Sequence, residues 1–190
     1  MPETRLSQFI HRSNLVSQTT SLEIAKRFTD RRLSKNEYLL KAGQIADAYF
    51  LLDKGYMRAF AEDTAGNEVT TAFYAPGQMI FEVASFFKRT RSKENIQALT
   101  DCEGAFITYQ ELNELFHALP EFREFGRSVL VDGFSTLKNR MLATITETAE
   151  ERYAALLKSN PEIFQHAPLK YIASYLGITD TSLSRIRAKK

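Results

Sequence analysis

Residues 169–190 have the pattern of two short amphipathic helices joined by a sharp turn, and this feature constrains the fold most. Gly177 supplies the positive φ that ends a helix and starts a tight turn. Thr179 is a suitable N-cap for a second helix, in which Leu183 and Ile186 repeat at helical spacing. This is the spacing of a DNA-binding helix-turn-helix, whose second helix enters the major groove.

The outer face of the predicted second helix carries hydroxyl groups and cations, which suit phosphates and base edges. We expect DNA contacts from Thr179, Thr181, Ser182, Arg185, Arg187 and Lys189. Residues 166–190 hold five cations and one acid, a net charge of +4, whereas the whole chain is +2 and residues 1–165 are therefore −2. Such concentrated positive charge favours a polyanionic partner. The alternative is a helical hairpin that only packs, because one glycine between two helices is common.

The first half of the chain has the pattern of an antiparallel β-structure. Gly43, Gly55, Gly66 and Gly77 recur at nearly regular intervals, and segments rich in aromatic and aliphatic residues lie between them. Residues 63–67 are a turn signal between two strand-like runs. Short strands at this spacing predict a sandwich or barrel. We therefore expect an α+β protein with an antiparallel β-roll or jelly-roll domain.

A proline-free stretch from Glu121 to about Thr148 predicts one long helix of up to about 28 residues, or roughly 40 Å. An apolar stripe close to the coiled-coil period runs along it through Leu130, Phe134, Leu137, Met141 and Ile145. A small β-domain cannot support a helix of this length, so we predict that two copies pair along the stripe as a two-fold dimer. The alternative is that the stripe covers the chain's own core.

Composition excludes several other classes of protein. No apolar run approaches the roughly 18 residues that cross a bilayer, and the N-terminal segment is too polar for a signal peptide, so we expect a cytoplasmic protein without membrane contact. The single cysteine, Cys102, is expected in a packed core and cannot form an internal disulfide or an iron–sulfur site. His11, His117 and His166 lie outside the predicted strands, which argues against a metal-dependent β-barrel enzyme. We expect no catalytic residue, metal or cofactor.

With these three parts in this order, the chain resembles the Crp/Fnr family of bacterial transcription regulators. The resemblance rests on LSKNEYLLKAG, DAYFLLDKGYMRAF and DTAGNEVTTAFYAPGQMI in the first half and on IASYLGITDTSLSRI near the end. It is strongest toward a short subgroup of Bacteroidetes-type bacteria. The resemblance implies a cyclic-nucleotide-binding-like β-roll with flanking helices (1–119), a dimerisation helix (120–148) and a helix-turn-helix DNA-binding domain (149–190) without the β-hairpin wing that often follows.

The resemblance also locates a ligand pocket, where this sequence departs from the family pattern. Nucleotide-binding members carry Gly-Glu-Leu and, about ten residues later, Arg-Ser-Ala. The matching segments here are Phe81-Glu82-Val83 and Ser92-Lys93-Glu94. Serine cannot replace the bidentate, permanently charged arginine that pairs with a phosphate. We expect a degenerate pocket at Phe81, Glu82, Ser92 and Lys93 with weak or no binding of cyclic AMP, and a solvated loop over residues 88–95. The alternative is that Arg89, Arg91 or Lys93 reaches the pocket.

The predicted recognition helix departs from the family pattern too. Members that read G/C-containing half-sites commonly use an arginine, a glutamate and a second arginine, and the matching residues here are Asp180, Thr181 and Arg185. Arg185 is therefore the candidate for a guanine contact, with a phosphate contact as the alternative. The implied partners are double-stranded DNA, a second copy of the chain and RNA polymerase, and no effector is identified. The alternative function is a ligand-binding regulatory module that acts through protein–protein contacts.

Overall fold

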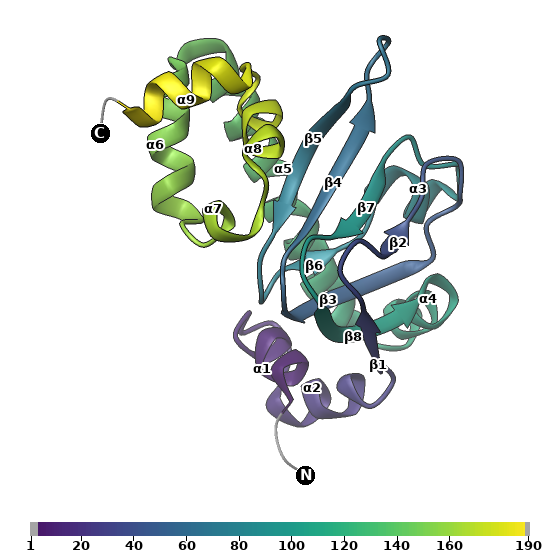
Figure 1. Ribbon diagram of the computed structural model, residues 1–190. Helices are drawn as coiled ribbons and strands as arrows, with labels where there is room; N and C mark the ends of the chain where they lie inside the picture. Colours follow the sequence, from purple (N-terminus) through teal and green to yellow (C-terminus); the bar gives the residue numbers. More distant parts are fainter. Residues whose placement is uncertain (1–3, 189–190) are drawn as a thin grey trace.

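The computed structural model describes residues 4–188, in which a β-sandwich is followed by a long helix and a C-terminal helical unit (Figure 1). Two four-stranded antiparallel sheets form the sandwich, in the orders β1-β8-β3-β6 and β2-β7-β4-β5. The strands are β1 Thr29–Leu33, β2 Tyr38–Leu40, β3 Ala48–Lys54, β4 Met57–Glu62, β5 Glu68–Tyr74, β6 Met79–Ile80, β7 Asn95–Ala98 and β8 Cys102–Thr108. The predicted α+β class and antiparallel β-roll are confirmed.

The regularly spaced glycines lie in the turns between these strands. Gly55 joins β3 to β4 with φ +91°, and a Cβ there would lie 2.3 Å from the carbonyl oxygen of Asp101, so only glycine fits. In the β4–β5 hairpin, the Asp63 carboxylate accepts hydrogen bonds from the amides of Ala65 and Asn67, both at 2.9 Å. These bonds fix the predicted turn at residues 63–67 and thereby the register of the longest hairpin.

The core lies between the two sheets and is closed by four short helices. They are α1 Arg5–His11, α2 Gln18–Ala25, α3 Val83–Lys88 and α4 Tyr109–Ala118. Phe50 and Ile80 from the sheets are fully buried, and Ile10 and Ile24 bring the helical hairpin α1–α2 into the same cluster. Cys102 is a buried free thiol at the start of β8, as the sequence predicts.

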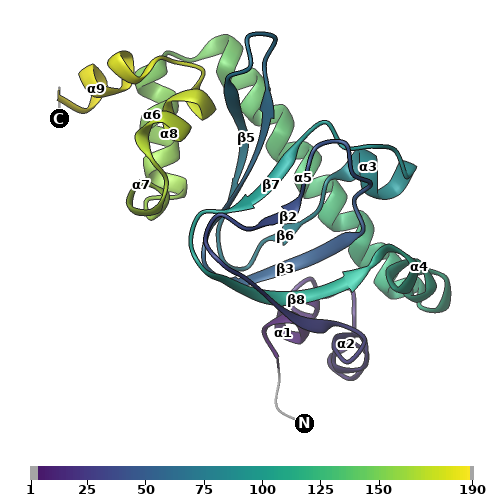
Figure 2. The same cartoon turned by 45° about the vertical axis from the view of Figure 1, so that its right-hand side comes forward.

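The long helix α5 spans Pro120–Thr146 and leads from α4 along the sandwich to the C-terminal unit (Figure 2). Phe122 and Phe125 anchor its first turns in the core, and most of the rest of the helix is exposed. The helix ends at Thr146, two residues before the approximate end that the sequence predicts. Thr148 instead caps the next helix, because its Oγ1 accepts from the Glu151 amide at 3.3 Å and its amide donates to the Glu151 carboxylate at 2.8 Å.

The C-terminal unit consists of four helices around a small apolar core. They are α6 Ala149–Ser159, α7 Ile163–His166, α8 Leu169–Leu176 and α9 Asp180–Ala188. Its buried residues include Leu156, Ile172, Leu183 and Ile186. The single turn α7 lies between Pro161 and Pro168, in the segment that links α6 to α8. Helices α8 and α9, with Gly177 at φ +69° between them, form the predicted helix-turn-helix.

Candidate nucleic-acid interface

Helix α9 buries one side and exposes the other. Thr179 begins it as the N-cap, since its Oγ1 accepts from the Ser182 amide at 3.2 Å. Leu183 and Ile186 are buried against the other helices of the unit. Because these residues are three apart, the intervening and flanking positions face outward. The exposed set is Asp180, Thr181, Ser184, Arg185, Arg187 and Ala188.

The structure brings most of the predicted DNA-contact residues onto this outer side. Thr179, Thr181, Arg185 and Arg187 are exposed. Ser182 is half-buried, and its hydroxyl lies 3.0 Å from that of Thr179, which gives it a part in the cap. Lys189 lies outside the described residues. Within residues 4–188, Arg185 and Arg187 form no ion pair, so both guanidinium groups are available to an anion.

Two arginines from other helices hold the end of the supporting helix α8. Arg140 of α5 donates to the carbonyl of Tyr175 at 3.0 Å, and Arg152 of α6 donates to the carbonyl of Leu176 at 2.9 Å. Both carbonyls belong to the last turn of α8, where cations interact favourably with the helix dipole. The turn before α9 is therefore fixed from outside the helix-turn-helix, which sequence reasoning did not predict.

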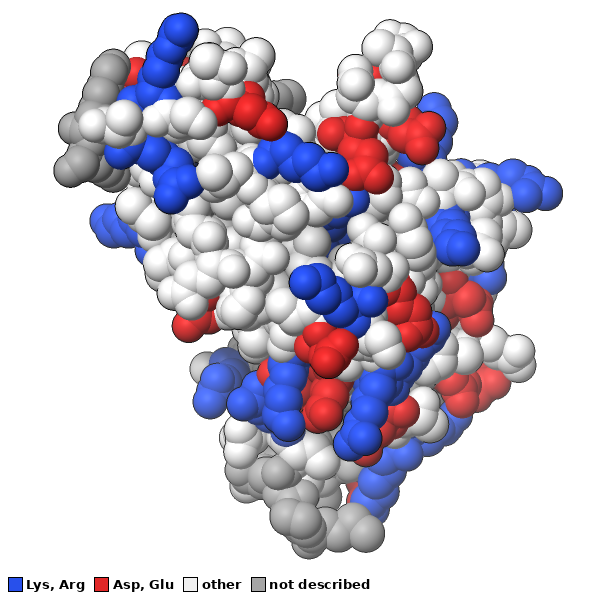
Figure 3. Space-filling model, viewed as in Figure 1, with Lys and Arg blue, Asp and Glu red and all other residues white. Residues whose placement is uncertain are grey.

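Surface charge differs between the two ends of the molecule. In Figure 3, blue side chains predominate over the C-terminal helices at the upper left, with some red ones among them, whereas blue and red side chains alternate on the lower part. On the β1–β8 surface, Glu103 pairs with Arg32 at 3.5 Å and with Lys54 at 3.1 Å. The hydrogen bond and charge of Lys54, together with Arg32, lower the pKa of the Glu103 carboxyl. The cations of the sandwich are thus partly neutralised, while those of α9 are not.

The predicted dimerisation stripe is mostly exposed along α5. The exposed fractions are 67% for Phe134, 62% for Leu137, 54% for Met141 and 73% for Ile145. Leu130 is less exposed than the other four and is half-buried, because it lies nearer the anchored end of the helix. Leu142, which sequence reasoning missed, widens the stripe and is also exposed. Four of the five stripe residues therefore do not cover the chain's own core, and contiguous exposed apolar side chains are typical of a protein interface.

The expected ligand pocket of the β-roll is filled by the chain's own side chains. Phe81 packs its ring against Tyr49, with ring centres 4.8 Å apart, and against Phe86 at 5.9 Å. Glu82 is occupied as the N-cap of α3, where its carboxylate accepts from the amides of Ala84 and Ser85. The cavity beside them measures about 10 Å³, which is room for about one water molecule and far below the size of a nucleotide site.

The second half of the expected pocket is structural as well. Ser92 is buried, and its Oγ donates to the Glu94 carbonyl at 2.8 Å, so our expectation of a solvated loop is wrong at this residue. Arg89 pairs with Asp47 at 3.0 Å, and Arg91 donates to the carbonyl of Gly43 at 2.7 Å. Lys93 is the predicted pocket residue that stays exposed. The side chains present thus do not fit a cyclic nucleotide phosphate.

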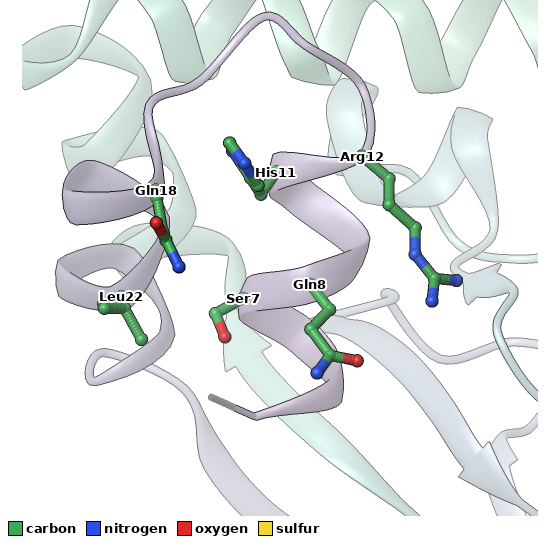
Figure 4. Close-up of a pocket in the computed structure, with 6 residues that line it drawn as sticks. All are labelled: Ser7, Gln8, His11, Arg12, Gln18 and Leu22. Carbon is green, nitrogen blue, oxygen red and sulfur yellow. The ribbon is translucent and has the colours of Figure 1, made fainter. Parts of the chain in front are cut away.

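A larger hollow of about 290 Å³ lies between α1 and α2 (Figure 4). It is lined by Ser7, Gln8, His11, Arg12, Gln18 and Leu22. It lies at the end of the molecule opposite α9 (Figure 1) and is separate from the outer face of that helix. Among the described residues, no cluster of histidine, cysteine and carboxylate side chains could hold a metal ion, and no helix is long and apolar enough to cross a membrane.

Sequence comparison relates both halves of the chain to known regulators. Residues 30–118 match the family model of the cyclic nucleotide-binding domain. The transcriptional activator protein Anr of Pseudomonas protegens is 26% identical over 184 residues, which cover 91% of this chain and 74% of that protein. FnrA of Stutzerimonas stutzeri is 26% identical over 175 residues, which cover 86% of this chain and 70% of that protein.

Solved structures give the same result for the fold. FixK2 from Bradyrhizobium japonicum aligns with a TM-score of 0.71 at 18% identity and covers 85% of this chain and 83% of its own. A regulator of the Crp/Fnr family from Eubacterium rectale aligns with a TM-score of 0.73 at 14% identity and covers 96% of this chain and 87% of its own. At these identities the likeness shows the fold, which extends over the sandwich, the long helix and the C-terminal helices.

Proposed function

We propose that this chain, a Crp/Fnr-type protein in sequence and in fold, is a dimeric, sequence-specific DNA-binding transcription regulator with a degenerate nucleotide pocket. The observation that carries the proposal is the outer side of α9, where hydroxyl groups and two unpaired guanidinium groups are exposed while the apolar side is buried. Such a surface suits phosphates and the base edges of the major groove. We place the protein in the cytoplasm, with RNA polymerase as a further partner and without enzymatic activity.

The dimer follows from the exposed stripe of α5. Pairing of Phe134, Leu137, Met141 and Ile145 with the same residues of a second copy removes them from water in a two-fold interface. Each copy then presents one α9 helix, so a dimer offers two recognition helices to two half-sites of a duplex. Dimerisation therefore increases both the affinity and the length of the sequence that the protein reads.

Arg185→Ala tests this function through the affinity for a duplex, measured by fluorescence anisotropy at several salt concentrations. We expect the substitution to weaken binding by about 1–3 kcal/mol, that is roughly 5- to 150-fold, because a charged donor to DNA is lost. Loss of specificity at one base position identifies a guanine contact. A reduction of about one in the slope of log affinity against log salt concentration identifies a phosphate contact.

The matched control is Arg12→Ala, since Arg12 is exposed at the far end of the molecule beside α1. This substitution removes the same charge and should leave DNA affinity within about twofold. Binding that responds neither to salt nor to Arg185→Ala would favour a module that acts through protein–protein contacts.

A further inference from the structure

The helix-turn-helix is docked on the β-sandwich rather than only tethered to it. Helix α8 lies beside β5, the edge strand of its sheet (Figure 1). The rings of Phe73 and Tyr175 meet with their centres 5.1 Å apart, and Tyr56 stacks on His166 at 4.2 Å. Tyr56, Phe73 and Leu99 of the sandwich are buried in the same cluster as the core of the C-terminal unit. The two parts therefore share an apolar core.

Polar contacts fix the orientation of this docking. The Thr70 amide of β5 donates to Ser174 Oγ of α8 at 3.1 Å, and the two hydroxyl oxygens are also 3.1 Å apart. Arg140 of α5 donates both to the carbonyl of Thr71 in β5 and to that of Tyr175 in α8. One guanidinium group thus links the dimerisation helix, the hairpin and the helix-turn-helix. Directional bonds of this kind permit few relative orientations of the parts.

Arg58 lies at the centre of the contact and depends on it. Its guanidinium group is sandwiched between two rings, 3.4 Å from the centre of Tyr171 and 3.9 Å from that of Phe60. Only 1% of the residue is exposed, and it pairs with Glu68 at 2.7 Å. Its Nε and Nη1 atoms have no hydrogen-bond partner among the described residues. This buried cation is stabilised by the Glu68 carboxylate, by a hydrogen bond to the Gln97 side chain at 3.1 Å and by the two ring faces, of which Tyr171 belongs to the C-terminal unit.

We name this contact the domain joint and define it by Arg58, Thr70, Arg140, Tyr171 and Ser174. The residues of the C-terminal unit in the joint, Tyr171 and Ser174, belong to α8. The neighbouring stacking contact joins Tyr56 to His166 of α7. None of these contacts involves α9, whose polar side stays exposed while the domains are docked. The docked arrangement therefore leaves the candidate DNA surface free.

We propose that the domain joint holds the recognition helix in its DNA-binding orientation without a small-molecule effector. An effector acts only by binding one arrangement of the protein better than another. Here the cavity where a cyclic nucleotide would bind is filled by the chain's own side chains. The residues of the domain joint already favour the docked arrangement. The inference rests on the proposed DNA-binding function and adds that this function is intrinsic to the apo-protein. Arg58 and Tyr171 act as positioning residues, since they do not touch the DNA.

A reversible cross-link of the joint tests this inference. Thr70→Cys with Ser174→Cys places two sulfur atoms where the hydroxyl oxygens are 3.1 Å apart, within reach of a disulfide after small rotations. The full chain carries Cys102→Ala in addition, so that no other thiol interferes. Affinity for one duplex is measured for the oxidised and the reduced protein, and the two single-cysteine proteins serve as controls. We expect the oxidised protein to bind within about twofold of the reduced protein, because docking and DNA binding are compatible.

Loss of more than about tenfold in affinity on oxidation, reversed by dithiothreitol, overturns the inference and makes the joint an inhibitory contact. In that case the reduced protein still binds, so the proposed function stands. If wild-type, reduced and oxidised proteins all fail to bind any duplex, the proposed function fails and the inference fails with it.

Tyr171→Ala gives a second test that needs no disulfide. It removes one ring face from Arg58, and we expect about tenfold weaker DNA binding, corresponding to a docked population near one tenth. Leu169→Ala is the control, because Leu169 lies on the same helix and is exposed. Circular dichroism establishes that both variants are folded. Unchanged or tighter DNA binding by folded Tyr171→Ala overturns the inference.

Discussion

At the scale of single residues, the side chains around the expected nucleotide pocket serve the β-roll itself. Phe81 fills the space, Glu82 caps α3 and Ser92 ties down its loop. Burial raises the pKa of the Glu94 carboxyl, and the neighbouring Glu82 raises it further. The small remaining volume and the lack of a phosphate-binding arginine at Ser92 therefore exclude a cyclic nucleotide together.

We therefore predict that cyclic nucleotides do not stabilise the protein. A ligand at one hundred times its Kd adds about 2.7 kcal/mol to the free energy of unfolding, which is several degrees of Tm for a domain of this size. A thermal-shift series with cyclic AMP, cyclic GMP and a cyclic dinucleotide should leave Tm within about 1 °C. A rise of several degrees at micromolar nucleotide would contradict our assignment of Phe81 and Ser92.

At the scale of elements, α5 is buried in one part of its length and exposed in the other. Phe122 and Phe125 bury its beginning in the core, and the stripe residues beyond Leu130 are exposed. In an isolated chain, the contiguous stripe exposes more apolar surface than the single, scattered apolar residues that are normal on a protein surface. Arg140 lies among the stripe residues in sequence but belongs to the domain joint. The helix therefore connects the proposed dimer interface to the helix-turn-helix.

Leu137→Glu tests the dimer interface. A charge at an apolar seam disfavours pairing, and because Leu137 is 62% exposed the single chain should remain folded. We expect a monomer by size-exclusion chromatography with light scattering, and DNA affinity at least tenfold weaker because one half-site is lost. Asn139→Glu is the control on another side of the same helix and should remain dimeric. A dimer that survives Leu137→Glu would place the interface elsewhere.

Elements with a strong periodic signal could be predicted from the sequence. The seven-residue repeat identifies α5, and the apolar spacing with Gly177 and Thr179 identifies α8 and α9. The positions of α1, α2 and α7 could not be predicted, because α1 and α7 are too short and the apolar residues of α2 form no clear stripe at helical spacing. The domain joint was also beyond sequence reasoning. Arg58 lies between apolar residues in β4, a pattern that predicts a solvent-facing side chain. Its partner Tyr171 is far away in the chain, so the sequence gives no sign of their contact.

At the scale of the whole molecule, the sandwich, α5 and the C-terminal helices form one connected structure. The shared apolar cluster and the joint fix the helix-turn-helix on the β4–β5 hairpin, while α9 remains on the surface (Figure 2). A second copy paired through α5 would repeat this surface about a two-fold axis. The geometry of the complete dimer, rather than any single contact, then determines the spacing of the half-sites.

The most direct measurement is selection of bound duplexes from a random pool with the purified, nucleotide-free protein, followed by sequencing. We expect enrichment of one inverted repeat, with half-site centres about 10 base pairs apart or a multiple of that spacing. We also expect Arg185→Ala to weaken or change the selected half-site. Enrichment of no sequence, or of an asymmetric single site bound equally well by Arg185→Ala, would contradict a dimeric regulator that reads DNA through α9.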